Sequence, residues 1–459
     1  MKAGWKTVPL EALAAQQKGA VKIGPFGSQL KKSDLVSSGI HVVGIENVLS
    51  GTFDGLGERF ISSEKFKTLR TVEVLPGDLL ITMMGTIGKV AVVPRGIGTT
   101  IMDSHLLRVR PDQKLCITEY LGWAIQGSPA VQEVIEAKAH GAIMRGLNSA
   151  IVRSLPILLP PLLDQRRIVG ILDEAFEGIA TAKANAEKNL QNARALFGSA
   201  LNAAIQGKLV PHENGDASVE DLLSQIQESR NTAIEQGRAK RRKTTPIDTD
   251  SGDRPDLPRS WKWTQLESLS VGISDGVHKT PTYVSDGIPF VTVKNLTAGP
   301  GIRFDDLNYI TKADHEEFIK RTYPEKGDVL ITKDGTIGVV RLIETDIEFS
   351  IFVSVALIKP VMRELGPYLA YALRAPCVQS QIVPQGAALK HLYLVDLRML
   401  AIPLPPLSEQ KRIVGRLDTL AVEAQRLESL YERKLAALEA LKKSLLHQAF
   451  TDQLGTQAA

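Results

Sequence analysis

Residues 159–173 read LPPLLDQRRIVGILD, and residues 404–418 read LPPLSEQKRIVGRLD. The two stretches are identical at 11 of 15 positions and lie 245 residues apart, and this spacing holds without a gap as far as Leu209 and Leu454. Such a long self-similar register within one chain indicates duplicated structural units. The chain is therefore predicted to consist of two homologous halves, each a folded region followed by a long helix, and to act on something that has two parts.

Further repeats extend this pattern toward the N-terminus, with slightly different spacings that insertions and deletions in loops would produce. An apolar run that starts with Gly-Ile occurs in both halves and ends at Asn47 and at Asn295. Two short motifs also return, GDLLIT (77–82) and GTIG (85–88) as GDVLIT (327–332) and GTIG (335–338). The residues between these markers differ strongly. A shared frame with divergent loops is the pattern expected of two recognition modules that read different targets.

Composition bounds the class of protein. A chain of 459 residues is too long for one compact core, so two or more domains are expected. The net charge of +4, from 55 basic and 51 acidic residues, leans only weakly toward a polyanionic partner, so any nucleic-acid contact must depend on local patches. The two cysteines, Cys116 and Cys377, lie outside any metal-ligand spacing, which favours a reducing compartment. No apolar stretch reaches membrane-spanning length and no signal sequence is recognisable, so a cytoplasmic protein without membrane contact is expected.

A heptad pattern begins at Asp164 and predicts a coiled coil. Small and apolar residues follow alternating steps of four and three from Ile168 to Ala203, and the same seam returns 245 residues later. A seam that is matched in two places predicts that helices near 164–206 and 409–451 pack on each other, each about 60 Å long. Matched polar breaks in the seam, Asn189 and Lys434, favour an antiparallel pair in which they lie near each other and form a buried pair that fixes the register. The alternative is a long amphipathic helix on a globular core.

These features predict an α/β protein with two tandem mixed α/β modules, related by a pseudo-twofold axis and separated by the long helices. The predicted segments are a first module (1–158), a central helical spacer (159–258), a second module (259–403) and a C-terminal helix (404–459). Within the spacer, Ser218 and Asp221 predict a capped helix that ends near Gln236. The polar stretch that follows, 237–256, is expected to be a flexible linker. Its basic run, Lys240, Arg241, Arg242 and Lys243, could contact phosphate, but a solvated linker is the favoured interpretation.

Motifs for catalysis and cofactor binding are missing from the sequence. There is no Walker loop, and GTIG lacks both the helix and the downstream acid that a dinucleotide site needs. Pro111-Asp112 with Glu136 and Lys138 matches the PD…ExK pattern of metal-dependent nucleases. The second half has no matching carboxylates, and the Glu-x-Lys falls on an ordinary amphipathic stretch, so a nuclease is disfavoured. We expect no catalytic residue, no metal and no cofactor.

Candidate nucleic-acid contacts lie in the divergent loops and beside the Gly-rich turns. KIGPFGSQLKKSD (22–34) and SDGVHKTPTY (274–283) are loops with small, hydrogen-bonding side chains, which suit phosphate and base-edge contacts. A basic residue also follows a Gly-Ala pair at matched positions of the two modules. The candidates are Lys22, Ser28, Gln29, Lys31, Lys32, Asn47, Thr86 and Arg145 in the first module, and His278, Lys279, Thr280, Tyr283, Lys294, Asn295, Lys333 and Lys390 in the second.

The paired LPPL motifs, the GD…GTIG frames and ALNAAIQGKLVP (200–211) together resemble the specificity subunit of type I restriction–modification systems, over essentially the whole chain. The resemblance implies two target recognition domains, each reading one half of a bipartite sequence in double-stranded DNA. It implies that the two long helices dock two methyltransferase subunits, and that restriction subunits with translocase activity join them. It also implies a chain that catalyses nothing, with the methyl donor, ATP and Mg²⁺ bound only by partner subunits.

A function of another class stays open from the sequence, namely a coiled-coil scaffold that carries two protein- or RNA-binding modules. Aromatic residues make up only 5% of the chain, and single-stranded RNA is commonly bound by stacking its bases on aromatic side chains. The low aromatic content therefore argues against the RNA form of this alternative.

Overall fold

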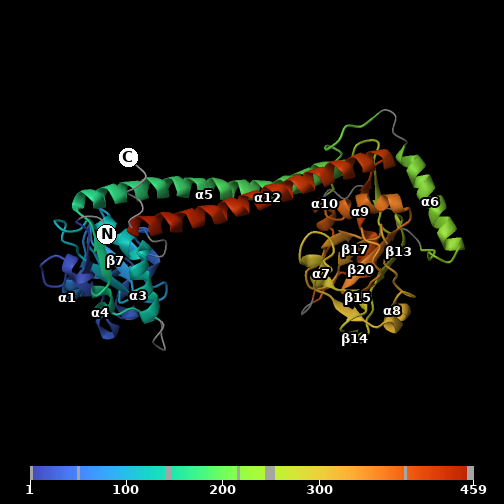
Figure 1. Cartoon of the computed structure of the whole chain (residues 1–459). Helices are drawn as coiled ribbons and strands as arrows, with labels where there is room; N and C mark the ends of the chain where they lie inside the picture. Colours follow the sequence, from blue (N-terminus) through green and yellow to red (C-terminus); the bar gives the residue numbers. More distant parts are fainter. Residues whose placement is uncertain are drawn as a thin grey trace. The chain divides into compact units, whose positions relative to one another are not determined.

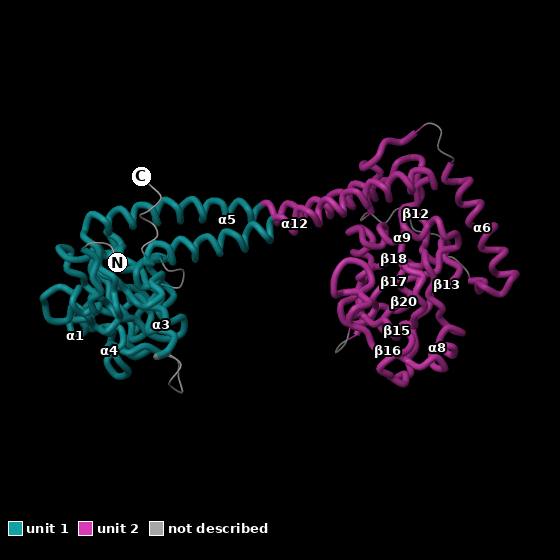
Figure 2. Tube along the Cα trace, viewed as in Figure 1, with its two compact units in different colours: residues 1–188, 431–459 teal, residues 189–430 magenta. Residues whose placement is uncertain are grey.

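The computed structural model describes residues 4–48, 52–139, 146–213, 218–242, 254–386 and 390–451 (Figure 1). The chain divides into two compact units (Figure 2): unit 1 contains residues 1–188 and 431–459, and unit 2 contains residues 189–430. Each unit holds one α/β module and one half of each long helix, as the sequence predicts for the fold class. Among the described residues, no helix is both long and apolar enough to cross a bilayer.

The module of unit 1 is built on an antiparallel four-stranded sheet in the order β2-β10-β7-β8. A five-stranded sheet, β3-β5-β4-β9-β6, adds one parallel pair, β4 with β9, and the short pair β1-β11 joins the two ends of the module. The strands are β1 (Lys6–Pro9), β2 (Val21–Ile23), β3 (Leu35–Val36), β4 (Ile40–Val43), β5 (Phe60–Ile61), β6 (Glu73–Val74), β7 (Leu79–Thr82), β8 (Val90–Val92), β9 (Thr100–Met102), β10 (Leu106–Val109) and β11 (Pro156–Leu159).

Strand β7 explains why the GDLLIT motif is apolar without alternation. Leu79 and Ile81 pack in the core that contains Tyr120, whereas Leu80 packs in a second core with residues of the five-stranded sheet such as Val42. Successive side chains of a strand point to opposite faces, so a strand covered on both faces is apolar throughout. The helices of this module are α1 (Ser63–Leu69), α2 (Thr118–Gly127), α3 (Pro129–Ala139) and α4 (Ser149–Arg153), and they lead into α5 (Leu162–Ile205).

Unit 2 repeats this topology, with four strands instead of five in its second sheet. Its four-stranded sheet has the order β13-β20-β17-β18, its second sheet the order β14-β16-β15-β19, and β12 pairs with β21. The strands are β12 (Lys262–Gln265), β13 (Ser270–Asp275), β14 (Tyr283–Val284), β15 (Ile288–Val291), β16 (Asn308–Ile310), β17 (Val329–Thr332), β18 (Val340–Leu342), β19 (Ser350–Ile351), β20 (Val355–Pro360) and β21 (Ala401–Leu404). The helices are α7 (Val293–Thr297), α8 (Lys312–Phe318), α9 (Gly366–Ala372), α10 (Pro376–Gln379) and α11 (Leu394–Met399), followed by α12 (Leu407–Phe450).

The repeated LPPL motif anchors the start of each long helix. The buried Gln165 donates to the Pro160 carbonyl at 2.9 Å, and the buried Gln410 donates to the Pro405 carbonyl at 2.8 Å. The acid before each glutamine accepts an indole N–H from the start of its own module, Asp164 from Trp5 at 3.3 Å and Glu409 from Trp261 at 3.0 Å. The motif is therefore kept twice because it joins a module to its helix.

The long helices run antiparallel to each other within each unit. In unit 1, Lys183 Nζ of α5 pairs with Glu439 Oε1 of α12 at 2.7 Å. In unit 2, Arg194 Nε pairs with Glu428 Oε2 at 3.4 Å. Within unit 1, Lys442 Nζ of α12 also lies 5.3 Å from the centre of the Phe176 ring of α5, and within unit 2, His212 just beyond α5 lies 2.8 Å from Glu409 at the start of α12, so residue numbers rise along one helix as they fall along the other. The predicted helix bounds and direction agree with this arrangement.

The prediction that Asn189 and Lys434 form a buried pair is wrong, because both side chains are exposed. The residue after Asn189, Leu190, is partly buried instead, and it lies between the buried Ala186 and Ala193 in the sequence. A straight α-helix drifts by roughly 20° per heptad against a strict seven-residue repeat, so the packed seam moves one residue onward. The heptad count identified the helices but placed the contact one position too early.

Helix α6 (Val219–Glu235), between the two halves, has the cap that the sequence predicts. Ser218 Oγ accepts the Asp221 amide at 3.1 Å, and Asp221 Oδ2 accepts the Ser218 amide at 3.3 Å. Both contacts satisfy N–H groups that a helix leaves unpaired at its start.

Candidate nucleic-acid interface

In unit 2, four loops meet at one end of the four-stranded sheet. The segment after β13 pairs with the segment after β19 through Val277 and Phe352, and the turn after β17 pairs with the loop before α11 through Asp334 and His391. Lys333 links three of these segments, because its amide donates to the Ser354 carbonyl and its carbonyl accepts the Leu392 amide, both at 2.8 Å. Stretches that lie far apart in the sequence thus form one surface.

Unit 1 builds the same loop cluster at the matching end of its own sheet. Met84, in the turn after β7, pairs with Gly146, and the Met83 amide donates to the His105 carbonyl at 2.8 Å. Gly24, which directly follows β2, lies so close to the Asp103 backbone that a Cβ would meet the Asp103 oxygen at 1.8 Å. A side chain at this position would force the loops apart, which explains the glycine.

The GTIG motif shapes the turn at the centre of this cluster. Gly85 and Gly88 have φ values of 70° and 76°, and Gly335 and Gly338 have values of 70° and 87°, which favour glycine. The hydroxyl of the preceding threonine, Thr82 or Thr332, donates to a carbonyl of its own turn. The motif therefore holds a tight turn in both modules and leaves Thr86 exposed at its tip.

A buried carboxylate, Asp275, organises the cluster in unit 2. It is 5% exposed and lies 3.4 Å from His278 Nε2 and 3.4 Å from Lys333 Nζ, and it also pairs with Arg321. Next to it, His391 Nδ1 lies 2.5 Å from Asp334 Oδ1. Asp275 thus holds two cations and an imidazole in one place, and their N–H groups are donors that suit phosphate.

The recognition loop of unit 2 continues into α8. The Thr282 amide donates to Asp314 Oδ2 at 2.8 Å, and this bond, aided by the Lys279 charge, lowers the pKa of Asp314. Tyr283 is 50% exposed and meets Phe290 edge-on, with 6.2 Å between ring centroids. The loop is therefore held at its far end while its basic residues face solvent.

Unit 1 organises its cluster around Asp103, which is 6% exposed. Arg59 Nη1 lies 3.0 Å from Asp103 Oδ2, and His105 Nδ1 lies 3.3 Å from Asp103 Oδ1. Arg59 also pairs with Glu46 at 2.5 Å. The acid comes from a different loop than in unit 2, so the two clusters share a frame but differ in charge pattern.

Most of the predicted contact residues are exposed. His278 and Lys333 come together at Asp275, and the exposed Lys390 lies directly before His391 in the sequence. Lys22 is half-buried within β2, and Lys294 pairs with Asp306 at 2.5 Å. Arg145 lies outside the described residues. The exposed members are Ser28, Gln29, Lys31, Lys32, Thr86, His278, Lys279, Thr280, Tyr283, Lys294 and Lys390.

The matched asparagines have a clear internal role. Asn47 is 4% exposed; it accepts the Gly44 amide at 2.9 Å and donates to the Gly55 carbonyl at 2.5 Å. Asn295 is 4% exposed as well and accepts the Thr292 amide at 2.9 Å. These amides hold loops inside each module, so neither residue belongs to the proposed surface.

Four basic residues at these clusters were missed by sequence reasoning: Arg59 and His105 in unit 1, and Arg321 and His391 in unit 2. His391 directly follows the predicted Lys390, so its position in the sequence could have identified it. Arg59 and Arg321 had none, because their partners lie 44 and 46 residues away in the sequence.

Side chains suited to hold a metal do not gather in the part of the chain that the structure describes: no group of three or more His, Cys, Asp or Glu residues occurs there. Cys116 and Cys377 are both free thiols. The positive charge that would suit a polyanion comes from exposed lysines of the loops, Lys31 and Lys32 in unit 1 and Lys279 and Lys390 in unit 2.

Comparison with known proteins gives the class of protein. Residues 26–191 and 277–432 each match the family model described as type I restriction modification DNA specificity domain, so both modules carry it. The chain therefore belongs to the family of type I restriction–modification specificity subunits.

Relatives and solved structures agree with this family. The chain is 27% identical over 337 residues to the type I restriction enzyme EcoBI specificity subunit of Escherichia coli, an alignment that covers 72% of this chain and 65%, less than two thirds, of that subunit. Its fold is similar to a chain in the structure described as "Structural basis underlying complex assembly and conformational transition of the type I R-M system" (TM-score 0.67, 18% identity, 99% of both chains).

The fold is also similar to the HsdS subunit of Thermoanaerobacter tengcongensis (TM-score 0.58, 19% identity, 99% of this chain and 98% of that one). The curated relatives are named as specificity subunits rather than as methyltransferases or nucleases, in agreement with the expectation that this chain is not an enzyme.

Proposed function

We propose that each module reads one half of an asymmetric, bipartite sequence in double-stranded DNA through its loop cluster. The observation that carries the proposal is the same loop frame, held by the same turns in both units, with different exposed residues upon it. Lys31 and Lys32 project from the first cluster, and Lys279 and Lys390 from the second. Basic side chains neutralise phosphates, while the differing loop residues supply base contacts. Half-sites about one helical turn apart, roughly 34–36 Å, would suit two modules on one face of the duplex.

The long helices are proposed to dock two methyltransferase subunits, with restriction subunits joining the complex in the cytoplasm. Leu196 and Leu441 occupy the same position of the 245-residue repeat and are 45% and 46% exposed. Large apolar side chains that face solvent at matched positions suit two copies of one partner. The methyl donor, ATP and Mg²⁺ would then be bound by those partners.

Exchange of residues 1–158 for the first module of another family member tests this function. The complex with its methyltransferase subunits should then methylate a new target in which one half-site has changed and the other has not. Methylation mapped across a genome measures both halves at once. A swap that alters both half-sites, or neither, would show that the modules do not read DNA independently.

A further inference from the structure

The insertion between the two halves contributes a helix, α6, to unit 2. Helix α6 packs against β13 through a buried face of Val219, Leu222, Ile226, Arg230 and Ala233. The apolar members Val219, Leu222 and Ile226 belong to the main core of unit 2. The insertion is therefore fixed on the second module where α6 runs, and the basic run that follows it starts from a fixed point.

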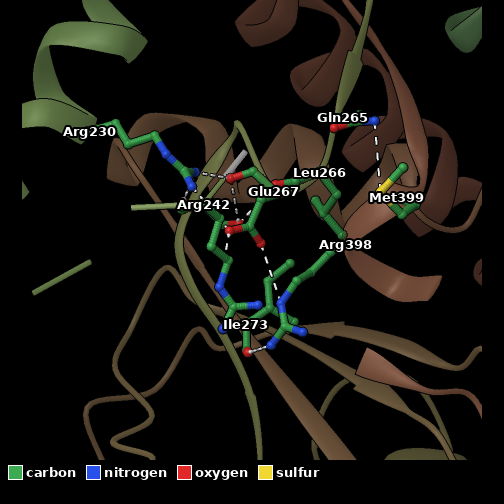
Figure 3. Close-up of polar contacts among 9 residues, drawn as sticks. Arg230, Arg242, Gln265, Leu266, Glu267, Ile273, Arg398 and Met399 are labelled. Atoms are coloured by element: carbon green, nitrogen blue, oxygen red, sulfur yellow. Dashed lines mark hydrogen bonds and ion pairs between the residues drawn. The ribbon is translucent and has the colours of Figure 1, made fainter. Parts of the chain in front are cut away.

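The arginine on this face joins a cluster around Glu267 (Figure 3). Arg230 is 6% exposed; it donates to the Ser270 carbonyl at 2.8 Å, and its Nη2 lies 3.1 Å from Glu267 Oε1. Arg398 Nε lies 3.4 Å from Glu267 Oε2, and Arg242 Nε lies 3.8 Å from Glu267 Oε1. Three guanidinium groups thus share one carboxylate.

Unit 1 contains the matching glutamate–arginine pair, formed by Glu11 and Arg153. Arg153 Nη1 lies 2.5 Å from Glu11 Oε1, and its Nη2 donates to the Val21 carbonyl at 2.9 Å. Arg398 makes the same two contacts in unit 2, with Glu267 and with the Ile273 carbonyl. The repeat therefore supplies one arginine for each glutamate, and the insertion adds the other two.

The additional arginines leave the second cluster with unbalanced positive charge. One carboxylate neutralises one of the three guanidinium groups, whereas Glu11 and Arg153 balance each other. Burial, and next the charge of Arg242, lower the pKa of Arg398, so the like charges are close enough to oppose each other. An anion bound at this place would relieve the repulsion.

The cluster adjoins the proposed DNA-reading loops. Arg398 donates to Ile273, two residues before Asp275 on β13, a separation of roughly 7 Å along a strand. Asp275 itself holds His278 and Lys333. Lys240 and Arg241 are exposed next to Arg242, whose side chain is 41% exposed. Lys243 lies outside the described residues.

We propose that Lys240, Arg241 and Arg242 form a phosphate-binding strap, which holds the sugar–phosphate backbone of duplex DNA beside the half-site of the second module. Sequence alone favours a solvated linker for this run. The pairing of Arg242 with Glu267 instead holds this end of the run beside Arg398, which donates to the Ile273 carbonyl of β13. This inference rests on the proposed DNA-reading function.

The test is the salt dependence of binding to a mixed-sequence duplex, with the full chain in complex with its methyltransferase subunits. Lys240→Ala with Arg241→Ala removes two exposed charges and leaves the Glu267 cluster whole. Each lost phosphate contact lowers the slope of log affinity against log salt by about 0.9. Between 50 and 200 mM salt, the affinity of the unaltered complex should therefore fall roughly tenfold more than that of the variant.

Lys326→Ala with Arg363→Ala is the charge-matched control. Both residues are exposed and lie beside Glu325 and Gly327, at the opposite end of β17 from Lys333, where Lys326 pairs with Asp346 at 2.9 Å and Arg363 with Glu325 at 3.3 Å. This control should leave the slope unchanged, and Lys390→Ala should lower it. If Lys390→Ala lowers the slope but the strap variant leaves it unchanged, the strap is overturned and the proposed function is not. A complex that binds no duplex overturns the strap together with the proposed function.

Discussion

The first and second modules carry the same glutamate–arginine pair, but they enclose it differently. The side chains of Glu11 and Arg153 are 60% and 35% exposed, whereas those of Glu267 and Arg398 are 13% and 17% exposed. The difference comes with α6, which adds Arg230 to the second pair. Exposed ion pairs contribute little to stability, while removal of one partner from an enclosed pair is costly. Matched positions of a repeat can therefore differ in energetic weight when a single additional helix covers one of them.

The largest effect is expected when this glutamate–arginine pair is broken in the second module, with the same change in the first module as the comparison. Arg398→Ala should lower the free energy of unfolding by about 2–3 kcal/mol, because Arg398 and Glu267 are enclosed and water does not readily replace the hydrogen bonds that are lost. Arg153→Ala, the matched change, should cost less than about 1 kcal/mol. Urea unfolding of the full chain measures both values. Equal costs would show that α6 does not set the difference.

Phe66 of α1 and His315 of α8 occupy matching helix positions in the two modules. His315 is 4% exposed, and its Nδ1 lies 2.9 Å from Ser350 Oγ. Desolvation lowers the pKa of His315, so the folded state holds it neutral while the unfolded state binds a proton near pH 6.5. The stability of unit 2 should therefore decrease as pH falls below about 6.5, down to the folded pKa, and should be fully present above it.

His315→Phe, which copies the first module, should remove this loss. Thermal unfolding midpoints at pH 7.5 and pH 5.5 measure it, and the variant should show a smaller difference between the two than the unaltered chain. His447→Gln, at an exposed histidine of α12, serves as the control and should change nothing. An unaltered pH dependence in His315→Phe would place the acid sensitivity elsewhere.

The smallest effect is expected where the two units resemble each other most, at the ion pairs between the long helices. The hydrogen bond and charge of Lys183 lower the pKa of Glu439, so the contribution of this pair is present above the unfolded pKa and is lost as pH falls through the folded value. Both pairs are open to solvent and screened by salt. Lys183→Ala and Arg194→Ala should each shift the urea midpoint only slightly at 50 mM salt and not at 500 mM. A large shift that persists at high salt would mean that these pairs, rather than the apolar seam, hold the helices together.

Sequence repetition was sufficient to predict the two modules, the bounds of both long helices within two residues and the capped helix at Ser218. Sequence reasoning failed where a side chain's surroundings come from distant strands. Asn47 and Asn295 were expected to face DNA because they follow matched strands, yet their amides close loops inside each module. Asn189 was expected in the helix seam because a strict heptad count leads there, whereas the helix follows its own period.

By itself the sequence determined the architecture, because periodicity, capping and repetition are local properties that the order of residues carries directly. Tertiary structure alone decided which charges meet. Arg321 reaches Asp275 across 46 residues, and Arg242 reaches Glu267 from an insertion that looks like a solvated linker. Such pairs depend on how strands and loops are brought together in space, and no short-range pattern encodes that. The excess of positive charge around Glu267 is a property of the folded unit, although every residue in it was visible in the sequence.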